Sequence, residues 1–245
     1  MTAVLSVRGL TKSFGAVRAL GPVDLDVAPR ERLGIIGPNG SGKTTLINCV
    51  SGLVAPDGGS IAFQGADITA LPAWRRARLG LSRSFQIPQP FAGMTVIENL
   101  LVPLDCLAPP GRRASASAAE RARELLRATG LLARRDDLAE TLSQLELRKL
   151  ELARALAAEP RVLIADEAMA GLSETEIDEV LALLFRLNEQ GVAVVMIEHI
   201  MHAVMRFSQR LVCLETGMII AAGTPAEVAA DETVQRVYFG DQADR

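Results

Sequence analysis

The sequence predicts an α/β protein that has a parallel sheet, an N-terminal antiparallel β-layer and an inserted helical lobe. Three observations lead to this prediction. A short apolar strand over residues 32–36 runs into a glycine-rich loop, after which a helical pattern begins. After Pro160, strand and helix patterns alternate, as they do in parallel sheets with crossover helices. Between these two regions, prolines separate several helical stretches. With 245 residues the chain can bury one large core, so we expect one main domain.

The bulk composition argues against two classes of protein. The formal net charge of -3 is unsuited to a surface that neutralises nucleic-acid phosphates, so we expect no nucleic-acid partner. Hydrophobic residues make up 49% of the chain, yet the longest apolar runs, such as residues 192–197, are too short to span a bilayer. No secretory signal follows Met1, and these features together predict a soluble chain in the cytosol.

The three cysteines predict no metal or redox site. Cys49, Cys106 and Cys213 are scattered and show no ligand spacing. We therefore expect three buried, reduced side chains.

The N-terminal β-layer and the helical lobe follow from local patterns. Residues 4–27 alternate apolar and polar side chains and are interrupted by Gly9, Gly15 and Gly21-Pro22, which predicts several short antiparallel strands. An Ala/Arg/Glu-rich stretch from 115 to 129 predicts a helix within the lobe.

The region after Pro160 predicts the second half of the sheet. The expected elements are strands at 162–165 and 192–197, helices at 174–188 and 201–206, and a hairpin of 211–214 with 218–220. Ser173 and Glu176 form a capping-box pattern at the start of the first helix, and Gly191 lies just past its end.

The glycine-rich loop has the pattern of a phosphate-binding loop. Its spacing, Gly-x-x-x-x-Gly-Lys-Thr, lets successive backbone N–H groups point at one anion at the start of a helix. Lys43 is expected to reach the β- and γ-phosphates, and the Thr44 hydroxyl is expected to bind Mg²⁺. The expected nucleotide-binding residues are Gly37, Pro38, Asn39, Gly40, Ser41, Gly42, Lys43, Thr44 and Thr45.

Two carboxylates follow the apolar strand at 162–165. A neighbouring parallel strand would place Asp166 and Glu167 beside the phosphates. Asp166 suits a Mg²⁺ ligand, and Glu167 suits a base that orients or deprotonates the attacking water. The sequence therefore predicts ATP or GTP as the bound nucleotide.

These motifs, together with Gln86 and with His199 just past the strand at 192–197, resemble the nucleotide-binding subunit of ABC transporters. The resemblance implies a P-loop NTPase (RecA-like) core in the ABC ATPase architecture, with ATP and Mg²⁺ as cofactors. It implies that Phe14 stacks on adenine, that Gln86 senses the γ-phosphate and Mg²⁺ and links to the membrane subunits, and that His199 contacts the γ-phosphate. It also implies a single domain over 1–245, with a catalytic core at 1–87 and 161–222, a helical subdomain at 88–160 and a tail at 223–245.

Three segments are more narrowly similar to the branched-chain amino acid importer branch of ABC ATPases. They are SRSFQIPQPFAGMTVIENL at 82–100, AGLSETE at 170–176, and the tail from GTPAEV at 223–228 to Gly240. That branch implies a second, different ATPase subunit, although a homodimer stays open, and two permeases with an external solute-binding protein. The chain would then be peripheral on the cytoplasmic face of the inner membrane. No residue reports the transported solute.

The sequence departs from the family at the signature, which normally contains Ser-Gly-Gly and approaches the γ-phosphate bound by the partner subunit. Here the matching residues are Ser143, Gln144, Leu145 and Glu146. Both glycines are replaced, while Ser143 and Glu146 form a capping-box pattern. We expect an asymmetric dimer in which the site built on Lys43, Asp166, Glu167 and His199 hydrolyses ATP quickly.

Two alternatives stay open. The missing glycines allow a binding-only or regulatory subunit, although Glu167 and His199 are retained. A soluble ABC ATPase that acts on DNA or ribosomes is the other, but the long insertions and positive charge common in such proteins are not visible.

Overall fold

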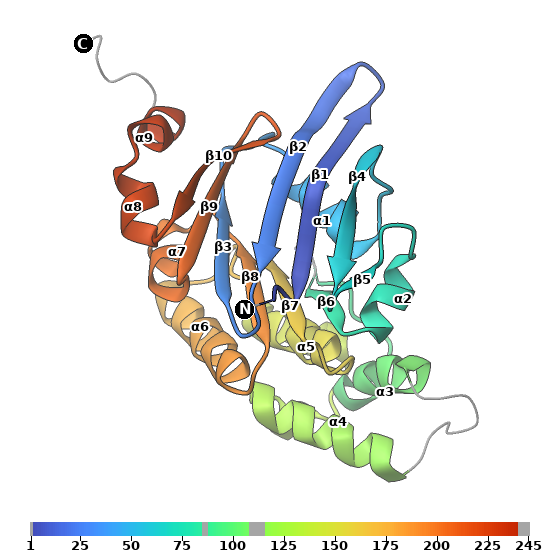
Figure 1. Cartoon of the computed structure of the whole chain (residues 1–245). Coiled ribbons are helices and arrows are strands. Elements are labelled where there is room, and N and C mark those ends of the chain that lie inside the picture. Colours follow the sequence, from blue (N-terminus) through green and yellow to red (C-terminus); the bar gives the residue numbers. More distant parts are fainter. Residues whose placement is uncertain (1, 85–87, 108–115, 240–245) are drawn as a thin grey trace.

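The computed structural model describes residues 2–84, 88–107 and 116–239 and contains two sheets with helices around them (Figure 1). The first sheet is four-stranded and antiparallel, in the order β2-β1-β4-β5. Its strands are β1 (Leu5–Phe14), β2 (Val17–Val27), β4 (Gly58–Phe63) and β5 (Ala66–Asp67). This sheet is the predicted N-terminal β-layer.

The prediction of several short strands in residues 4–27 is wrong, because β1 and β2 are two long strands. Gly9 lies within β1 at a register shift, where its N–H donates to Asp24 Oδ1 at 2.7 Å, so the strand bulges and continues. Pro22 lies in β2, and β2 is an edge strand, where a missing N–H donor is tolerated. Of the predicted interruptions, Gly15 alone lies between the two strands.

The second sheet is six-stranded, in the order β10-β9-β3-β8-β7-β6. Neighbouring strands are parallel except for the hairpin of β9 and β10. Its strands are β3 (Arg32–Ile36), β6 (Leu81–Ser84), β7 (Val162–Asp166), β8 (Ala193–Ile197), β9 (Arg210–Glu215) and β10 (Met218–Gly223). The predicted parallel sheet and hairpin are confirmed, with strand boundaries shifted by a few residues at most.

Helices cover both faces of the six-stranded sheet. α1 (Lys43–Ser51) packs between the two sheets, where Leu46, Ile47 and Val50 enter one apolar core. A second core on the opposite face includes residues of α6 (Glu174–Glu189) and α7 (Met201–Phe207). Alternate strand residues feed the two cores, since Leu163 belongs to one and Ile164 to the other. The predicted helices at 174–188 and 201–206 and the Ser173/Glu176 capping box are confirmed.

The described residues between β6 and β7 are mainly helical, as predicted, but Pro103, one of the prolines expected to separate helices, lies inside a helix. They form α3 (Val96–Leu107), α4 (Ala116–Thr129), the 3₁₀ helices η1 (Leu132–Arg134) and η2 (Ala139–Thr141), and α5 (Gln144–Leu156). Figure 1 shows α3 and α4 at the end of the molecule away from α8 and α9. The remaining helices are α2 (Ala73–Arg78), α8 (Pro225–Ala230) and α9 (Glu232–Phe239).

The cysteine prediction is only partly right. Cys49 and Cys213 are buried, but Cys106 is exposed because the last turn of α3 reaches the surface, where Arg78 binds the Cys106 carbonyl. Within the described ranges, every helix is too short or too polar to cross a bilayer.

Candidate nucleotide site

Three neighbouring strands of the parallel sheet end at one edge, and the predicted site residues follow them. The phosphate loop follows β3, Asp166 ends β7, and His199 lies two residues past β8. The register pairs Ile197 of β8 with both Ile35 and Asp166, so β8 lies between the other two strands. Chain segments more than 120 residues apart therefore meet at the carboxyl edge, where α/β sheets bind ligands.

The phosphate loop folds around its own lysine. Lys43 Nζ donates to the carbonyls of Gly37 at 2.7 Å and Pro38 at 2.8 Å. Burial lowers the pKa of Lys43, and the negative charges of Glu167 and Asp166 oppose that shift. The ammonium group is thus held at the centre of the loop, next to the N-terminus of α1.

Two glycines of this loop are required by close packing. A Cβ at Gly37 would lie 2.2 Å from Leu214 O, and one at Gly42 would lie 2.7 Å from Ala19 O. Gly40 also has positive φ but faces open space. The loop therefore tolerates no side chain at its first or last glycine.

The C-terminal helix also touches this loop. The Gly37 N–H donates to the Tyr238 hydroxyl at 2.6 Å, and Tyr238 belongs to α9. Burial raises the pKa of Tyr238 to about 12, so the hydroxyl stays protonated at neutral pH. No local pattern links residues 201 positions apart, and the sequence prediction missed this contact.

Asp166 and Glu167 have different surroundings. Asp166 is buried and pairs with Arg83, whose Nη2 lies 2.5 Å from Oδ2. Glu167 is half-buried and adopts a left-handed backbone conformation with φ of 46°, while its N–H donates to Ile197 O at 2.9 Å. Such a conformation is rare outside glycine, so it redirects the chain sharply after β7.

A buried glutamate precedes His199. His199 is exposed, whereas Glu198 is 1% exposed and its Oε1 accepts a hydrogen bond from the Met169 N–H at 2.9 Å. Burial, with a smaller contribution from the charge of Glu167, raises the pKa of Glu198 to about 7. Glu198 thus ties the loop after Glu167 to the end of β8, and the sequence prediction missed it.

The remaining predicted ligands lie at the periphery. Phe14 is 52% exposed at the end of β1, with Lys12 Nζ 5.5 Å from its ring centroid. Its open ring face is compatible with stacking. Thr44 is exposed in the first turn of α1, and Thr45 is half-buried beside it. Gln86 falls outside the described residues.

The donor set at this edge suits Mg²⁺. Thr44 offers a hydroxyl and Asp166 a carboxylate, and Mg²⁺ prefers oxygen ligands together with phosphate oxygens. Over residues 2–84, 88–107 and 116–239, no cluster of three or more His, Cys, Asp or Glu side chains could form a metal cage. The residues therefore fit a metal that arrives with a nucleotide.

The signature residues form the start of α5. Ser143 caps the helix, its Oγ accepting from the Glu146 N–H at 3.3 Å while Glu146 Oε2 accepts from the Ser143 N–H at 2.8 Å, which confirms the predicted capping box. Gln144 Nε2 donates to Ala170 O at 3.2 Å, and Leu145 is half-buried. The Glu146 carboxylate also pairs with Arg134 at 3.3 Å.

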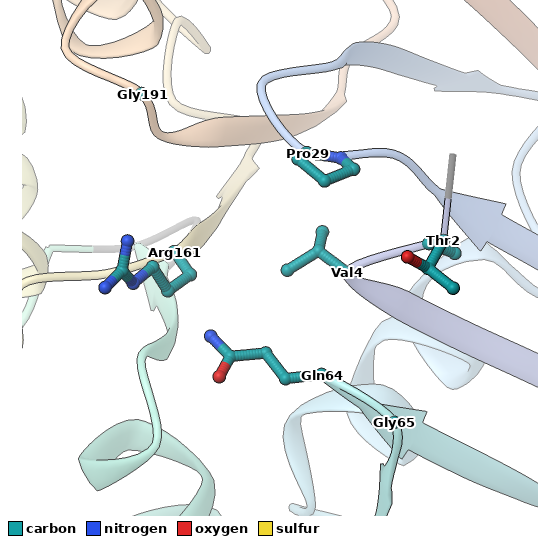
Figure 2. Close-up of a pocket in the computed structure, with 8 residues that line it drawn as sticks. Thr2, Val4, Pro29, Gln64, Gly65, Arg161 and Gly191 are labelled. Carbon is teal, nitrogen blue, oxygen red and sulfur yellow. The ribbon is translucent and has the colours of Figure 1, made fainter.

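A pocket of about 520 Å³ lies elsewhere and does not suit phosphates (Figure 2). Its lining includes Arg161 and Gly191, which precede β7 and β8, so it lies at the amino ends of those strands. Val4 and Pro29 contribute apolar surface beside Gln64. The carboxyl edge is the better candidate, because the loop, lysine and carboxylates meet there.

Comparison with known proteins decides the family. A family model described as "ABC transporter" matches residues 20–170, more than half of the chain. The chain belongs to the ABC transporter family. A second model, "Branched-chain amino acid ATP-binding cassette transporter", matches residues 218–244 of this ABC ATPase.

Several curated relatives cover nearly the whole length of the ABC ATPase. It is 37% identical to the high-affinity branched-chain amino acid transport ATP-binding protein LivG of Escherichia coli K12, over 97% of this chain and 98% of LivG. It is 38% identical, with the same coverage, to BraF of Pseudomonas aeruginosa, which has the same description. It is 36% identical, over 98% of both chains, to the lipopolysaccharide export system ATP-binding protein LptB of Haemophilus influenzae.

Solved structures agree with the fold. The ADP conformation of MJ1267, an ATP-binding cassette of an ABC transporter, has a TM-score of 0.90 and 31% identity, covering 98% of this chain and 100% of that one. A nucleotide-free cassette from an ABC transporter has a TM-score of 0.89, with the same identity and coverage. The predicted ABC ATPase architecture is confirmed, and the protein is an ATP-binding, ATP-hydrolysing subunit of a transporter.

Proposed function

We propose that this ABC ATPase drives the import of branched-chain amino acids or a related small polar solute from the cytoplasmic face of the inner membrane. The observation that carries the proposal is the match of residues 218–244 to the branched-chain amino acid model, in addition to the general match at 20–170. The relatives LivG and BraF support the same solute class.

The phosphate loop and its lysine bind the nucleotide in this proposal. Backbone N–H groups from Asn39 to Thr45 surround the β- and γ-phosphates, and Lys43 adds a fixed positive charge. Phe14 stacks on the adenine ring. Mg²⁺, held by Thr44 and Asp166 together with Gln86, would neutralise charge that develops on the phosphates.

Glu167 and His199 act on the attacking water and the γ-phosphate. Glu167 accepts a proton from, or orients, the water that attacks phosphorus, so ATP and water give ADP and phosphate. The hydrogen bond from the Glu167 N–H to Ile197 O joins the backbone at Glu167 to the strand that precedes His199. Both residues therefore follow neighbouring strands at the same carboxyl edge of the sheet.

The proposed assembly contains a second ATPase subunit, two permeases and, indirectly, an external solute-binding protein. We assign residues 1–87 and 161–222 to the catalytic core, 88–160 to the helical subdomain and 223–245 to a tail. Residues 86–99 and the helical subdomain would dock on the permeases. A heterodimer of ATPases is preferred over a homodimer because the signature departs from the family pattern.

The start of α5 supports an asymmetric dimer. The Gln144 side chain binds Ala170 O of its own chain, and the Glu146 carboxylate accepts the Ser143 N–H, so an incoming phosphate would find fewer backbone donors. The partner's ATP would thus face a poor signature, whereas the site on Lys43, Asp166, Glu167 and His199 would use the partner's signature. Only the latter site would turn over quickly.

Glu167→Gln tests this asymmetry in the reconstituted complex. We expect ATP hydrolysis to fall by about 10²–10⁴-fold, the contribution of a general base, while nucleotide binding persists. The equivalent change in the partner should cost less than tenfold, and Glu174→Gln, an exposed glutamate at the start of α6, is the matched control. Equal losses from both subunits would contradict the asymmetry. Wild-type chain that binds ATP but shows no single-turnover hydrolysis would favour a regulatory subunit.

Affinity purification from native membranes in mild detergent tests the transporter assignment. Two permeases and a second ATPase should copurify with the tagged chain, and the associated solute-binding protein should bind leucine, isoleucine or valine in a ligand screen. Copurification of a lipopolysaccharide-export complex would move the chain to the group of LptB, which is nearly as similar. Recovery of only ribosomal or nucleic-acid proteins would contradict import.

A further inference from the structure

A largely buried arginine that the sequence prediction did not single out contacts the proposed metal ligand. Arg83 Nη2 lies 2.5 Å from Asp166 Oδ2, and the two side chains are 9% and 7% exposed. Arg83 Nη1 donates to Asn48 Oδ1 at 2.7 Å. Arg83 lies on β6, Asp166 ends β7, and Asn48 belongs to α1, the helix that carries Lys43 and Thr44.

The contact restricts what Asp166 can do. A short charge-assisted hydrogen bond uses one carboxylate oxygen and fixes the orientation of the group. Because Asn48 holds the other end of the guanidinium, the carboxylate is positioned relative to the phosphate-loop helix, not merely relative to its own strand. Asp166 therefore has one oxygen engaged by protein before any metal binds.

The contact also changes the charge available to a metal ion. Asp166 lies within the electrostatic influence of Lys43 as well as beside Arg83, so two fixed cations offset Asp166 and Glu167. No ring of further carboxylates completes a cage in the described part of the chain. A divalent cation without a nucleotide meets little net negative charge here. The phosphates of a nucleotide would supply the missing negative charge and oxygen ligands.

We propose that Arg83 is a positioning residue that orients Asp166 and prevents divalent-cation binding unless a nucleotide is present. The inference deepens the proposed function and rests on the assignment of Asp166 as a metal ligand. It predicts opposite changes in two affinities when Arg83 is removed. Binding of the free cation should become tighter, because a buried carboxylate loses its cation, while productive binding of metal–ATP should become weaker, because the carboxylate loses its orientation.

Arg83→Gln tests the inference with Mn²⁺ as a paramagnetic substitute for Mg²⁺. Titration of the purified chain with Mn²⁺ at pH 8, followed by the loss of the free-ion EPR signal, should show binding about tenfold tighter or more than wild type without nucleotide. In the reconstituted complex the KM for Mg–ATP should rise at least about tenfold. Arg83→Lys keeps the charge but not the fork geometry, so it should restore weak Mn²⁺ binding while leaving KM raised.

Arg76→Gln is the matched control. Arg76 is a fully buried arginine that, like Arg83, binds α1, through the carbonyls of Cys49 and Val50, but it touches no carboxylate. Arg76→Gln should lower the midpoint temperature of thermal unfolding without tightening Mn²⁺ binding. If Arg83→Gln does not fold, Asn48→Ala, which removes the second anchor of the guanidinium, should still raise the KM for Mg–ATP while Mn²⁺ binding stays weak.

Two results would overturn the inference. One is Mn²⁺ binding in Arg83→Gln that equals or is weaker than wild type, while wild type binds Mn–ATP normally. The other is equal tightening in Arg76→Gln. Wild-type chain that binds neither a fluorescent ATP analogue nor Mn–ATP would instead contradict the proposed function, so the two failures are distinguishable.

Discussion

The phosphate loop and the start of α5 are both helix N-termini proposed to meet phosphates, but they are built differently. In the phosphate loop, backbone atoms lie so close together that Gly37 and Gly42 leave no room for a Cβ. At the start of α5, side chains make the structure, through the Ser143/Glu146 capping box and the Gln144 contact with Ala170 O. The first region has no room for a side chain at Gly37 or Gly42, whereas the second begins its helix with Gln144 and Leu145.

This difference distinguishes a helix N-terminus that binds a phosphate from one that is capped by the protein's own side chains. Backbone N–H groups can bind a phosphate only where no side chain intervenes, so glycines mark a region that binds. A capping box satisfies the same orphan N–H groups with the protein's own side chains, which stabilises the helix and leaves fewer donors for a ligand. The start of α5 is accordingly expected to support the helix more than it supports catalysis.

The first prediction contrasts two glycines of the phosphate loop. Gly37→Ala would force a Cβ to within 2.2 Å of Leu214 O, so we expect the free energy of unfolding to fall by about 1–3 kcal/mol and ATP binding to weaken more than tenfold. Gly40→Ala faces open space and should cost about 1 kcal/mol for its positive φ. Urea unfolding and titration with a fluorescent ATP analogue measure both. Equal costs would show that the loop relaxes more easily than its packing indicates.

The second prediction concerns Glu198, the buried glutamate that accepts the Met169 N–H beside the candidate nucleotide site. The pKa of Glu198 is about 7 in the native state and about 4.5 in the unfolded state. Between pH 4.5 and pH 7 the native state therefore binds more protons than the unfolded state, so the free energy of unfolding falls as pH rises through this range. Glu167, Asp166 and Arg148 are the charged groups that influence it. Glu198→Gln removes the titration and keeps an acceptor for the Met169 N–H.

Glu198→Gln should therefore gain stability relative to wild type as pH rises from 5 to 8. The difference in unfolding free energy should grow by about 2–4 kcal/mol over this range. Urea unfolding at both pH values measures it, and Glu174→Gln, an exposed change, should show no such growth. A pH-independent difference would mean that Glu198 is ionised throughout.

Tyr238→Phe tests how much the phosphate loop depends on its hydrogen bond to the C-terminal helix α9. The change leaves the ring in place but removes the acceptor of the Gly37 N–H, which costs about 1–2 kcal/mol when a buried donor is left unpaired. We expect the KM for ATP to rise about five- to thirtyfold with kcat little changed. Thr233→Ala, on the exposed face of the same helix, should leave both unchanged. A fall in kcat alone would instead place Tyr238 in the chemical step.

The smallest effect concerns the signature helix. Ser143→Ala should lower stability by about 1 kcal/mol, and Ser173→Ala at the equivalent capping box of α6 should do the same. Neither should change ATPase activity of the complex by more than about twofold, since a cap affects the helix and not the chemistry. A tenfold loss confined to Ser143→Ala would show that the start of α5 takes part in hydrolysis after all, and the contrast with the phosphate loop would disappear.

Local patterns in the sequence predict the parts of the fold that depend on neighbouring residues. The strand at Arg32–Ile36, the capping boxes and the phosphate loop each lie within a few residues, so periodicity and spacing suffice. The long strands β1 and β2 were mispredicted because a glycine that permits a bulge has the same letter as one that ends a strand. Only the pairing partner distinguishes the two cases.

The missed site residues share one property, which is that their contacts are distant in sequence. Arg83 meets Asp166 across 83 positions, and the Glu198 carboxylate meets the Met169 N–H across 29. An arginine in a strand or a glutamate before a histidine carries no local signal of burial. The tertiary structure was needed to show that both are enclosed and which groups they face.

The contact between Tyr238 and Gly37 has a consequence for the synthesis of the protein. The phosphate loop leaves the ribosome early, but the group that accepts the Gly37 N–H is translated 201 residues later. A nascent chain that has already formed β3 and α1 therefore lacks one hydrogen bond of its nucleotide site until α9 emerges. A chain truncated before α9 would form the phosphate loop without this hydrogen bond.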